Sequence, residues 1–169
     1  MKNYTFDQHR HNYATWTAAR AVQRDFTTTA KIKYAIEQSS LQRFAQDDNE
    51  VSVEQFATLH QRWAEQIISA LKAEGVQTVT YGRASKLISI YLKTSVILCN
   101  KGQCYRSSSI HPPIDGILLR SLSILPGLSD LKSIKWTLLE KDDYWKLAER
   151  LRNHFGSFDW RLEYYWMPR

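Results

Sequence analysis

The chain is organised around residues 80–119, which read TYGRASKLISIYLKTSVILCNKGQCYRSSSIHPPIDGILL. This stretch opens on a glycine turn at Gly82, after which apolar residues surround a predicted helix almost completely, so that helix is expected to be buried. Its polar residues Lys86, Ser89 and Lys93 share one narrow stripe, because steps of three, four and seven positions return to the same helical face. A buried lysine must meet water, a carboxylate or a ligand.

The second half of this stretch delivers an aspartate to the start of another helix. Residues 100–109 form a polar loop, and the pair Pro112–Pro113 that follows excludes a helix at that point, because proline lacks a backbone N–H and fixes φ. Asp115 then occupies the position expected for a helix N-cap, before apolar residues that begin at Ile117. Along this stretch, a turn therefore leads into a helix that carries a lysine, and a proline pair and an aspartate then lead into a second helix.

Helical periodicity dominates the rest of the sequence. The clearest helix is capped by Ser52 and ended by Gly75, with Phe56, Leu59, Trp63, Ile67, Ala70 and Leu71 facing inward. The only β-like patch, residues 77–80, is very short. We predict a single all-α domain over residues 1–169, a compact bundle of about six to eight helices. Further helices are expected over residues 5–24, with Tyr13 and Trp16 on one face, from the threonines 27–29 to about Phe44, over 142–155, and after Ser157.

Composition favours a nucleic-acid partner. The net charge is +6 over 169 residues, which suits a polyanion, although many basic proteins carry such a charge only for solubility. No apolar run is long enough to span a bilayer, and the N-terminus lacks a signal-peptide pattern. The two cysteines, Cys99 and Cys104, cannot form a four-ligand metal site by themselves. We expect a cytoplasmic monomer that uses no metal and no cofactor.

Lys86 and Asp115 are the candidate catalytic residues. Burial and the positive end of its helix both favour the neutral amine of Lys86. A free lysine with a pKa of about 10.4 is neutral in only about one molecule in a thousand at neutral pH, so activation costs about 4 kcal/mol. A nearby Asp115 could accept a proton or stabilise a cation. The spacing alone leaves open a second interpretation, in which Lys86 contacts phosphate and Asp115 is only a cap.

Other residues suit the binding of DNA. Thr80, Gly82 and Arg83 place a glycine turn at a helix N-terminus, which can cradle a phosphate. Six tryptophans and nine tyrosines could stack a flipped base, and they are densest around Trp160 and Trp166. Aromatic residues at this spacing also suit an ordinary core.

The runs KLISIYLK (residues 86–93) and IHPPID (110–115), followed by Leu119–Arg120, resemble the helix-hairpin-helix DNA glycosylase superfamily. They are most similar to the branch that contains the archaeal 8-oxoguanine DNA glycosylases, whose members carry a lysine, a second lysine seven residues later, and a Pro-hydrophobic-Asp that opens a helix. The resemblance covers about residues 80–122 and lacks the Gly-x-Gly of a typical hairpin. It implies a helix-hairpin-helix-like DNA-binding element.

The resemblance also implies a mechanism. Lys86 would attack the sugar C1′ of a nucleotide flipped out of double-stranded DNA, Asp115 would assist, and the resulting Schiff base would permit strand cleavage. The nearest branch suggests 8-oxoguanine as the substrate and DNA repair as the role. A hypermodified base in phage DNA, with a role in antiviral defence, is a separate hypothesis that no residue of the sequence supports. We expect DNA contacts from Thr80, Gly82, Arg83 and Lys93, and a base pocket that contains His111, Trp160 and Trp166.

Two other functions remain open from the sequence. A non-catalytic helical DNA-binding module would keep the charge, the aromatic residues and the glycine turn, with Lys86 as a phosphate contact. A helical ribonuclease of the HEPN type would use Arg106 and His111, which have the spacing of that class. That class needs its pair on a helix, and Pro112 follows His111 directly.

Overall fold

The computed structural model describes residues 3–22 and 26–167, and within these ranges the chain is helical and contains no strand. This confirms the all-α prediction. None of the described helices combines the length and the apolar character needed to cross a bilayer. The α-helices are α1 (Phe6–Val22), α2 (Thr29–Gln38), α3 (Leu41–Gln46), α4 (Val53–Ala73), α5 (Tyr81–Leu92), α6 (Gly116–Leu122) and α7 (Lys141–Phe155). A π-helical segment, η1 (Lys93–Ile97), and 3₁₀ segments η2 (Tyr105–Ser109), η3 (Ser129–Ser133), η4 (Trp136–Leu138) and η5 (Trp160–Tyr165) complete the described elements.

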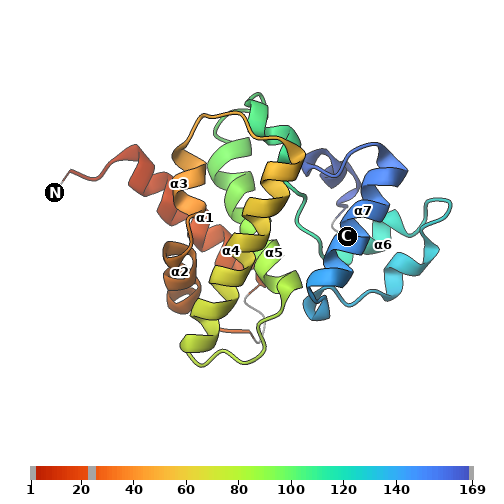
Figure 1. Cartoon of the computed structure of the whole chain (residues 1–169), viewed down its shortest axis with the longest axis horizontal. Coiled ribbons are helices and arrows are strands. Elements are labelled where there is room, and N and C mark those ends of the chain that lie inside the picture. The colour runs from red at the N-terminus through yellow and green to blue at the C-terminus, as the bar shows by residue number, and fades with distance from the viewer. Residues whose placement is uncertain (1–2, 23–25, 168–169) are drawn as a thin grey trace.

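Helix α5 is the centre of the fold, as its sequence predicts. It packs against α1 and α4 and also contacts α7 and η4. Ten of its twelve residues are buried. Figure 1 shows α1 to α5 gathered on one side of the molecule and α6, α7 and the C-terminal segment on the other. The approach to η4 requires a glycine, because a Cβ on Gly82 would lie 2.0 Å from the carbonyl oxygen of Trp136.

Helix α4 follows its sequence pattern closely. The hydroxyl of Ser52 accepts from the amide of Gln55, and the Gln55 side chain accepts from the amide of Ser52, which completes a capping box. The helix ends at a glycine with φ of +81°, Gly75. The predicted inward residues are buried or half-buried along its whole length.

Three predicted boundaries are wrong for local reasons. The second predicted helix is interrupted at Ser39, whose backbone is extended and whose hydroxyl donates to the carbonyl of Ile36, so α2 and α3 are separate. Residues 100–109 are predicted to be a loop throughout, but they contain the 3₁₀ segment η2, in which Arg106 is buried. The last helical segment is capped by Asp159 rather than Ser157 and is a 3₁₀ turn. Residues 23 and 24, the end of the first predicted helix, lie outside the described residues.

Candidate functional site

Lys86 and Asp115 form a buried ion pair. The Nζ of Lys86 lies 3.2 Å from Oδ2 of Asp115, although the two residues are 29 positions apart in the chain. Only 9% of the lysine side chain and 12% of the aspartate side chain are exposed. Helix α5 supplies the lysine, and the extended segment before α6 supplies the carboxylate. The structure therefore brings together the two residues that the sequence singles out.

Both oxygens of Asp115 are held by hydrogen bonds. Oδ1 accepts from the amides of Ile117 and Leu118, each at 2.9 Å, which makes Asp115 the N-cap of α6 as predicted. Oδ2 accepts from Lys86 and, at 3.1 Å, from the indole Nε1 of Trp166. Four donors fix the carboxylate, so its orientation toward Lys86 is set before any ligand binds.

Lys86 is in an environment that favours the neutral amine. Burial lowers the pKa of Lys86 below its ordinary value, and the neighbouring Asp115 opposes this shift without cancelling it. The Nζ also lies over the ring of Trp136, 4.4 Å from the ring centroid, and this cation–π contact favours the charged form, as Asp115 does. The effect of burial is the larger one, so Lys86 loses its proton more readily than an exposed lysine does.

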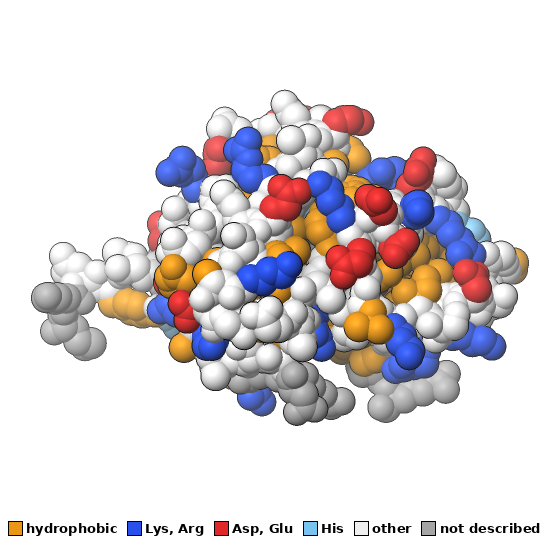
Figure 2. Space-filling view, turned by 60° about the horizontal axis from the view of Figure 1, so that its bottom comes forward, with side chains coloured by type: hydrophobic (Ala, Val, Ile, Leu, Met, Phe, Trp, Pro, Cys, Tyr) orange, Lys and Arg blue, Asp and Glu red, His pale blue; other side chains and the backbone are white. Residues whose placement is uncertain are grey.

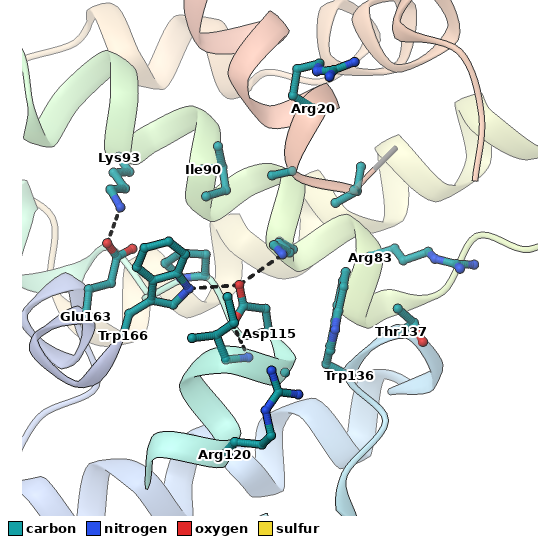
Figure 3. A pocket seen from close by; sticks show the side chains of 16 residues that line it. Arg20, Arg83, Ile90, Lys93, Asp115, Arg120, Trp136, Thr137, Glu163 and Trp166 are labelled. Atoms are coloured by element: carbon teal, nitrogen blue, oxygen red, sulfur yellow. Dashed lines mark hydrogen bonds and ion pairs between the residues drawn. The ribbon is translucent and has the colours of Figure 1, made fainter. Parts of the chain in front are cut away.

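These residues line a pocket of about 630 Å³ between α1, α5, α6 and the C-terminal segment. That volume is in the range of small-molecule sites. In Figure 3, Trp136 and Trp166 lie on opposite sides of Asp115. At another part of the wall, Lys93 at the start of η1 is paired with Glu163 of η5. Burial raises the pKa of Glu163, and Lys93 partly offsets that effect.

The pocket is basic. Among the described residues that line it, Asp115 and Glu163 carry carboxylates, and each is paired with a lysine. Three arginines stand beside these pairs, so the described lining has more basic than acidic side chains, which suits an anionic ligand. On the face drawn in Figure 2, Lys and Arg side chains are spread out with acidic and hydrophobic side chains between them, rather than in one block. The three arginines are Arg20, Arg83 and Arg120.

The predicted phosphate cradle is closed in this conformation. The amide of Gly82 donates to the carbonyl of Leu139 at 2.8 Å, and the hydroxyl of Thr80 donates to the carbonyl of Thr137 at 2.8 Å. These contacts occupy the groups that a phosphate would need, because η4 and the residue that follows it pack on the start of α5. Arg83 does line the pocket, although its guanidinium also donates to the carbonyl of Thr78.

Two residues of the predicted base pocket lie elsewhere. His111 is 1% exposed and packs in the core against Phe158, and Trp160 covers Gly102, where an added Cβ would lie 2.9 Å from the indole. Neither lines the pocket. Trp166, the third predicted residue, does line it.

His111 belongs to a buried group that we call the histidine cluster, made of His60, Tyr81, His111 and Tyr144. The Tyr144 hydroxyl lies 3.0 Å from Nδ1 of His111 and 3.5 Å from Nε2 of His60, and Nδ1 of His60 lies 3.2 Å from the Tyr81 hydroxyl. Burial lowers the pKa of His60 to about 3 and that of His111 well below its ordinary value. Both imidazoles are therefore neutral at physiological pH.

The ribonuclease arrangement is not formed. Arg106 is 2% exposed, and its guanidinium donates to the carbonyl of Phe44 and pairs with Asp48 at 3.6 Å. His111 is buried after η2 on an extended segment. Both residues have structural partners, and they do not share a helical face.

Sequence reasoning missed Trp136, Glu163 and Arg20 as pocket residues. They come from η4, η5 and the end of α1, and no local motif marks any of them.

Within the described ranges, no group of three His, Cys, Asp or Glu residues is placed to hold a metal ion. Comparison with protein-family models, curated proteins and solved structures gives no match for this chain.

Proposed function

We propose that this protein is a DNA glycosylase with an associated lyase activity. The observation that carries the proposal is the Lys86–Asp115 pair, buried and 3.2 Å apart on the wall of a basic, tryptophan-lined pocket. A lysine with a lowered pKa, a fixed carboxylate beside it and flat aromatic walls are the groups that amine attack on a nucleoside requires. The likeness of residues 80–122 to the helix-hairpin-helix glycosylases agrees with this assignment. In that interpretation α4, the turn at Gly75 and α5 form the hairpin element.

The first step displaces the base. Lys86 transfers a proton to Asp115, and its neutral Nζ attacks C1′ of the flipped nucleotide. The bond between C1′ and Nζ forms as the glycosidic bond breaks, and the base leaves with the bonding electron pair and takes up a proton. Asp115 supplies the proton that the leaving base takes up, and the carboxylate that results stabilises the positive charge that develops on the sugar.

The second step opens the sugar and cleaves the strand. The Nζ now bonded to C1′ loses a proton to the Asp115 carboxylate, which frees its lone pair. Donation of that lone pair expels the ring oxygen, which takes up a proton, and leaves an iminium between C1′ and Nζ. This cation makes the proton on C2′ acidic, and its removal expels the 3′-phosphate by β-elimination. Water then hydrolyses the iminium and regenerates Lys86, so no metal or organic cofactor is consumed.

The pocket walls suggest how a base is held. Trp136 contacts Lys86 and Trp166 contacts Asp115, so both indoles lie beside the reacting groups. Stacking on either ring would stabilise a flipped base. Lys93 and Glu163 offer a donor and an acceptor for polar groups of the base. The volume accepts 8-oxoguanine and larger modified bases of the kind found in phage DNA, and both are candidate substrates.

Borohydride trapping tests the proposal. The protein is mixed with duplexes that carry an abasic site, 8-oxoguanine, or hydroxymethylated or glucosylated cytosine, in the presence of sodium borohydride, which reduces the iminium to a stable amine. We expect a covalent adduct with the intact chain and with Lys93→Gln, and none with Lys86→Gln. An adduct that persists in Lys86→Gln contradicts the assignment, and the duplex that reacts identifies the substrate.

A non-catalytic DNA-binding module is the second candidate, favoured by the excess of arginines around the pocket. This function predicts that no adduct forms and no base is released. Lys86→Gln should then weaken DNA binding to the extent expected for the loss of one phosphate contact. A base-release assay run beside the trapping experiment separates the two functions, because a glycosylase releases base even when no adduct accumulates.

A further inference from the structure

Helix α1 carries an exposed aromatic stripe that leads to the pocket. The stripe consists of Phe6, Tyr13, Trp16 and Arg20, which follow one another by seven, three and four positions and therefore share one face of the helix. Its last member, Arg20, lines the pocket. At about 1.5 Å per residue, the stripe extends about 20 Å from the pocket along α1.

The aromatic members of the stripe are accessible. Tyr13 and Trp16 are 55% and 51% exposed, and Phe6 is more exposed still. The rings of Tyr13 and Trp16 stack on each other, with centroids 5.8 Å apart and planes at 28°. The opposite face of α1, which includes Ala14 and Ala18, is completely buried against the bundle. The helix thus uses small residues for the core and places its large rings in solvent.

Charge along α1 permits the approach of a polyanion. The only acidic residue of the helix is Asp7, which is paired with Arg10 at 2.9 Å. The stripe ends at a pocket whose described lining includes five basic and two acidic residues. Exposed aromatic rings beside a basic groove are the elements with which proteins bind unpaired nucleic-acid strands, since each base can stack on a ring and each phosphate can meet a cation.

We propose that the α1 stripe binds a single-stranded segment of DNA that adjoins the nucleotide in the pocket. The proposal rests on the proposed function for the identity of the ligand in the pocket. It narrows the substrate to DNA whose bases are unpaired next to the target nucleotide, as in a bubble or at a strand end. A paired flank leaves no base faces to stack on Tyr13 and Trp16.

Binding measurements on the whole protein test this assignment. Fluorescence anisotropy is recorded with a labelled single-stranded oligothymidine, its fully paired duplex, and the same duplex with a central unpaired bubble. We expect the single strand and the bubble to bind more tightly than the duplex. The double variant Tyr13→Ser, Trp16→Ser should weaken binding of the single strand by about tenfold or more, and binding of the duplex by less than about twofold.

Two further variants control for loss of surface area and for loss of the ring. Tyr105→Ser removes a ring that is 78% exposed outside the stripe and should leave all three affinities unchanged. Trp16→Phe keeps a stacking surface and should retain most of the single-strand affinity. Equal weakening for single strand and duplex, or none for either, overturns the proposal. So does a wild-type dimer in sedimentation that Trp16→Ser converts to a monomer, because the stripe would then bind a second copy.

The trapping experiment separates this inference from the proposed function. Stripe-dependent binding of the single strand with neither a Lys86 adduct nor base release would leave the stripe as a DNA contact and refute the glycosylase. A normal adduct on the bubble and on the duplex alike, with no effect of the double variant, would refute the stripe and leave the glycosylase.

Discussion

Two clusters of buried polar side chains both include a residue of α5, yet they differ in what surrounds them. Lys86 and Asp115 line an open pocket and face its basic wall. The histidine cluster is sealed, and its four members are each at most 2% exposed and hydrogen bond to one another. Burial shifts pKa values in both clusters, so a shifted pKa alone does not identify a site. Access to a ligand distinguishes them.

The largest effect should follow from Asp115→Asn. Asparagine caps a helix about as well as aspartate, so the fold should persist, but the acceptor and the negative charge beside Lys86 are lost. Base release should fall by roughly 10²–10⁴-fold, the usual contribution of general acid–base catalysis. Single-turnover kinetics measure this change. Asp159, a buried N-cap outside the pocket, gives the matched control Asp159→Asn, which should change base release by no more than a few fold.

The sealed cluster should make the fold sensitive to acid. The folded-state pKa of His60 is about 3, against an ordinary value of 6.5. Below about pH 6.5 the unfolded chain therefore binds more protons than the folded one, and stability falls as pH drops toward 3. The slope should approach about 1.4 kcal/mol per pH unit for His60, with an added contribution from His111. Urea unfolding between pH 7 and pH 4 measures it, and a slope unchanged in His60→Gln would contradict this origin.

Tyr144→Phe should separate the clusters most cleanly. The change removes the hydroxyl that lies between His60 and His111 and leaves buried imidazole nitrogens without that partner. Unfolding free energy should fall by about 1–3 kcal/mol. Borohydride trapping at a temperature where the variant is folded should be unchanged. A variant that is fully stable yet fails to trap would mean that the histidine cluster takes part in the chemistry.

The smallest effect should come from Trp166→Phe. Phenylalanine keeps a ring beside Asp115 but cannot donate to Oδ2, so one of four hydrogen bonds to the carboxylate is lost. We expect base release to slow by about tenfold or less and the unfolding free energy to fall by about 1 kcal/mol or less. Trp160→Phe, which alters the indole over Gly102 outside the pocket, is the control and should leave base release unchanged.

Much of the fold can be read from local pattern. The apolar surround of α5 predicts its burial, and the Ser52 cap and Gly75 bound α4 correctly. Asp115 caps α6 because the prolines before it cannot be helical and it is the first residue able to cap. Local sequence does not predict the break at Ser39, because a serine inside a helical pattern is common. The break arises from the bond that the Ser39 hydroxyl makes to the backbone.

The candidate site was predictable only in part. The lysine stripe identifies Lys86 and Lys93, because one helix places both on one face. The partners of these lysines cannot be predicted from the local sequence. Glu163 and Trp136 reach the pocket from η5 and η4. The predicted phosphate cradle at the start of α5 is closed by Thr137 and Leu139. Each of these contacts joins segments that are distant in the chain.

Local sequence predicts most of the helices, the burial of Lys86 and the capping role of Asp115, because periodicity, proline geometry and side-chain capping act over a few residues. Only the tertiary structure decided that Asp115 meets Lys86, that His111 lies in a sealed cluster, and that Trp166 rather than Trp160 reaches the pocket. These outcomes depend on how the C-terminal segment packs against α5, and long-range packing is fixed by the shape of the whole core rather than by any local motif.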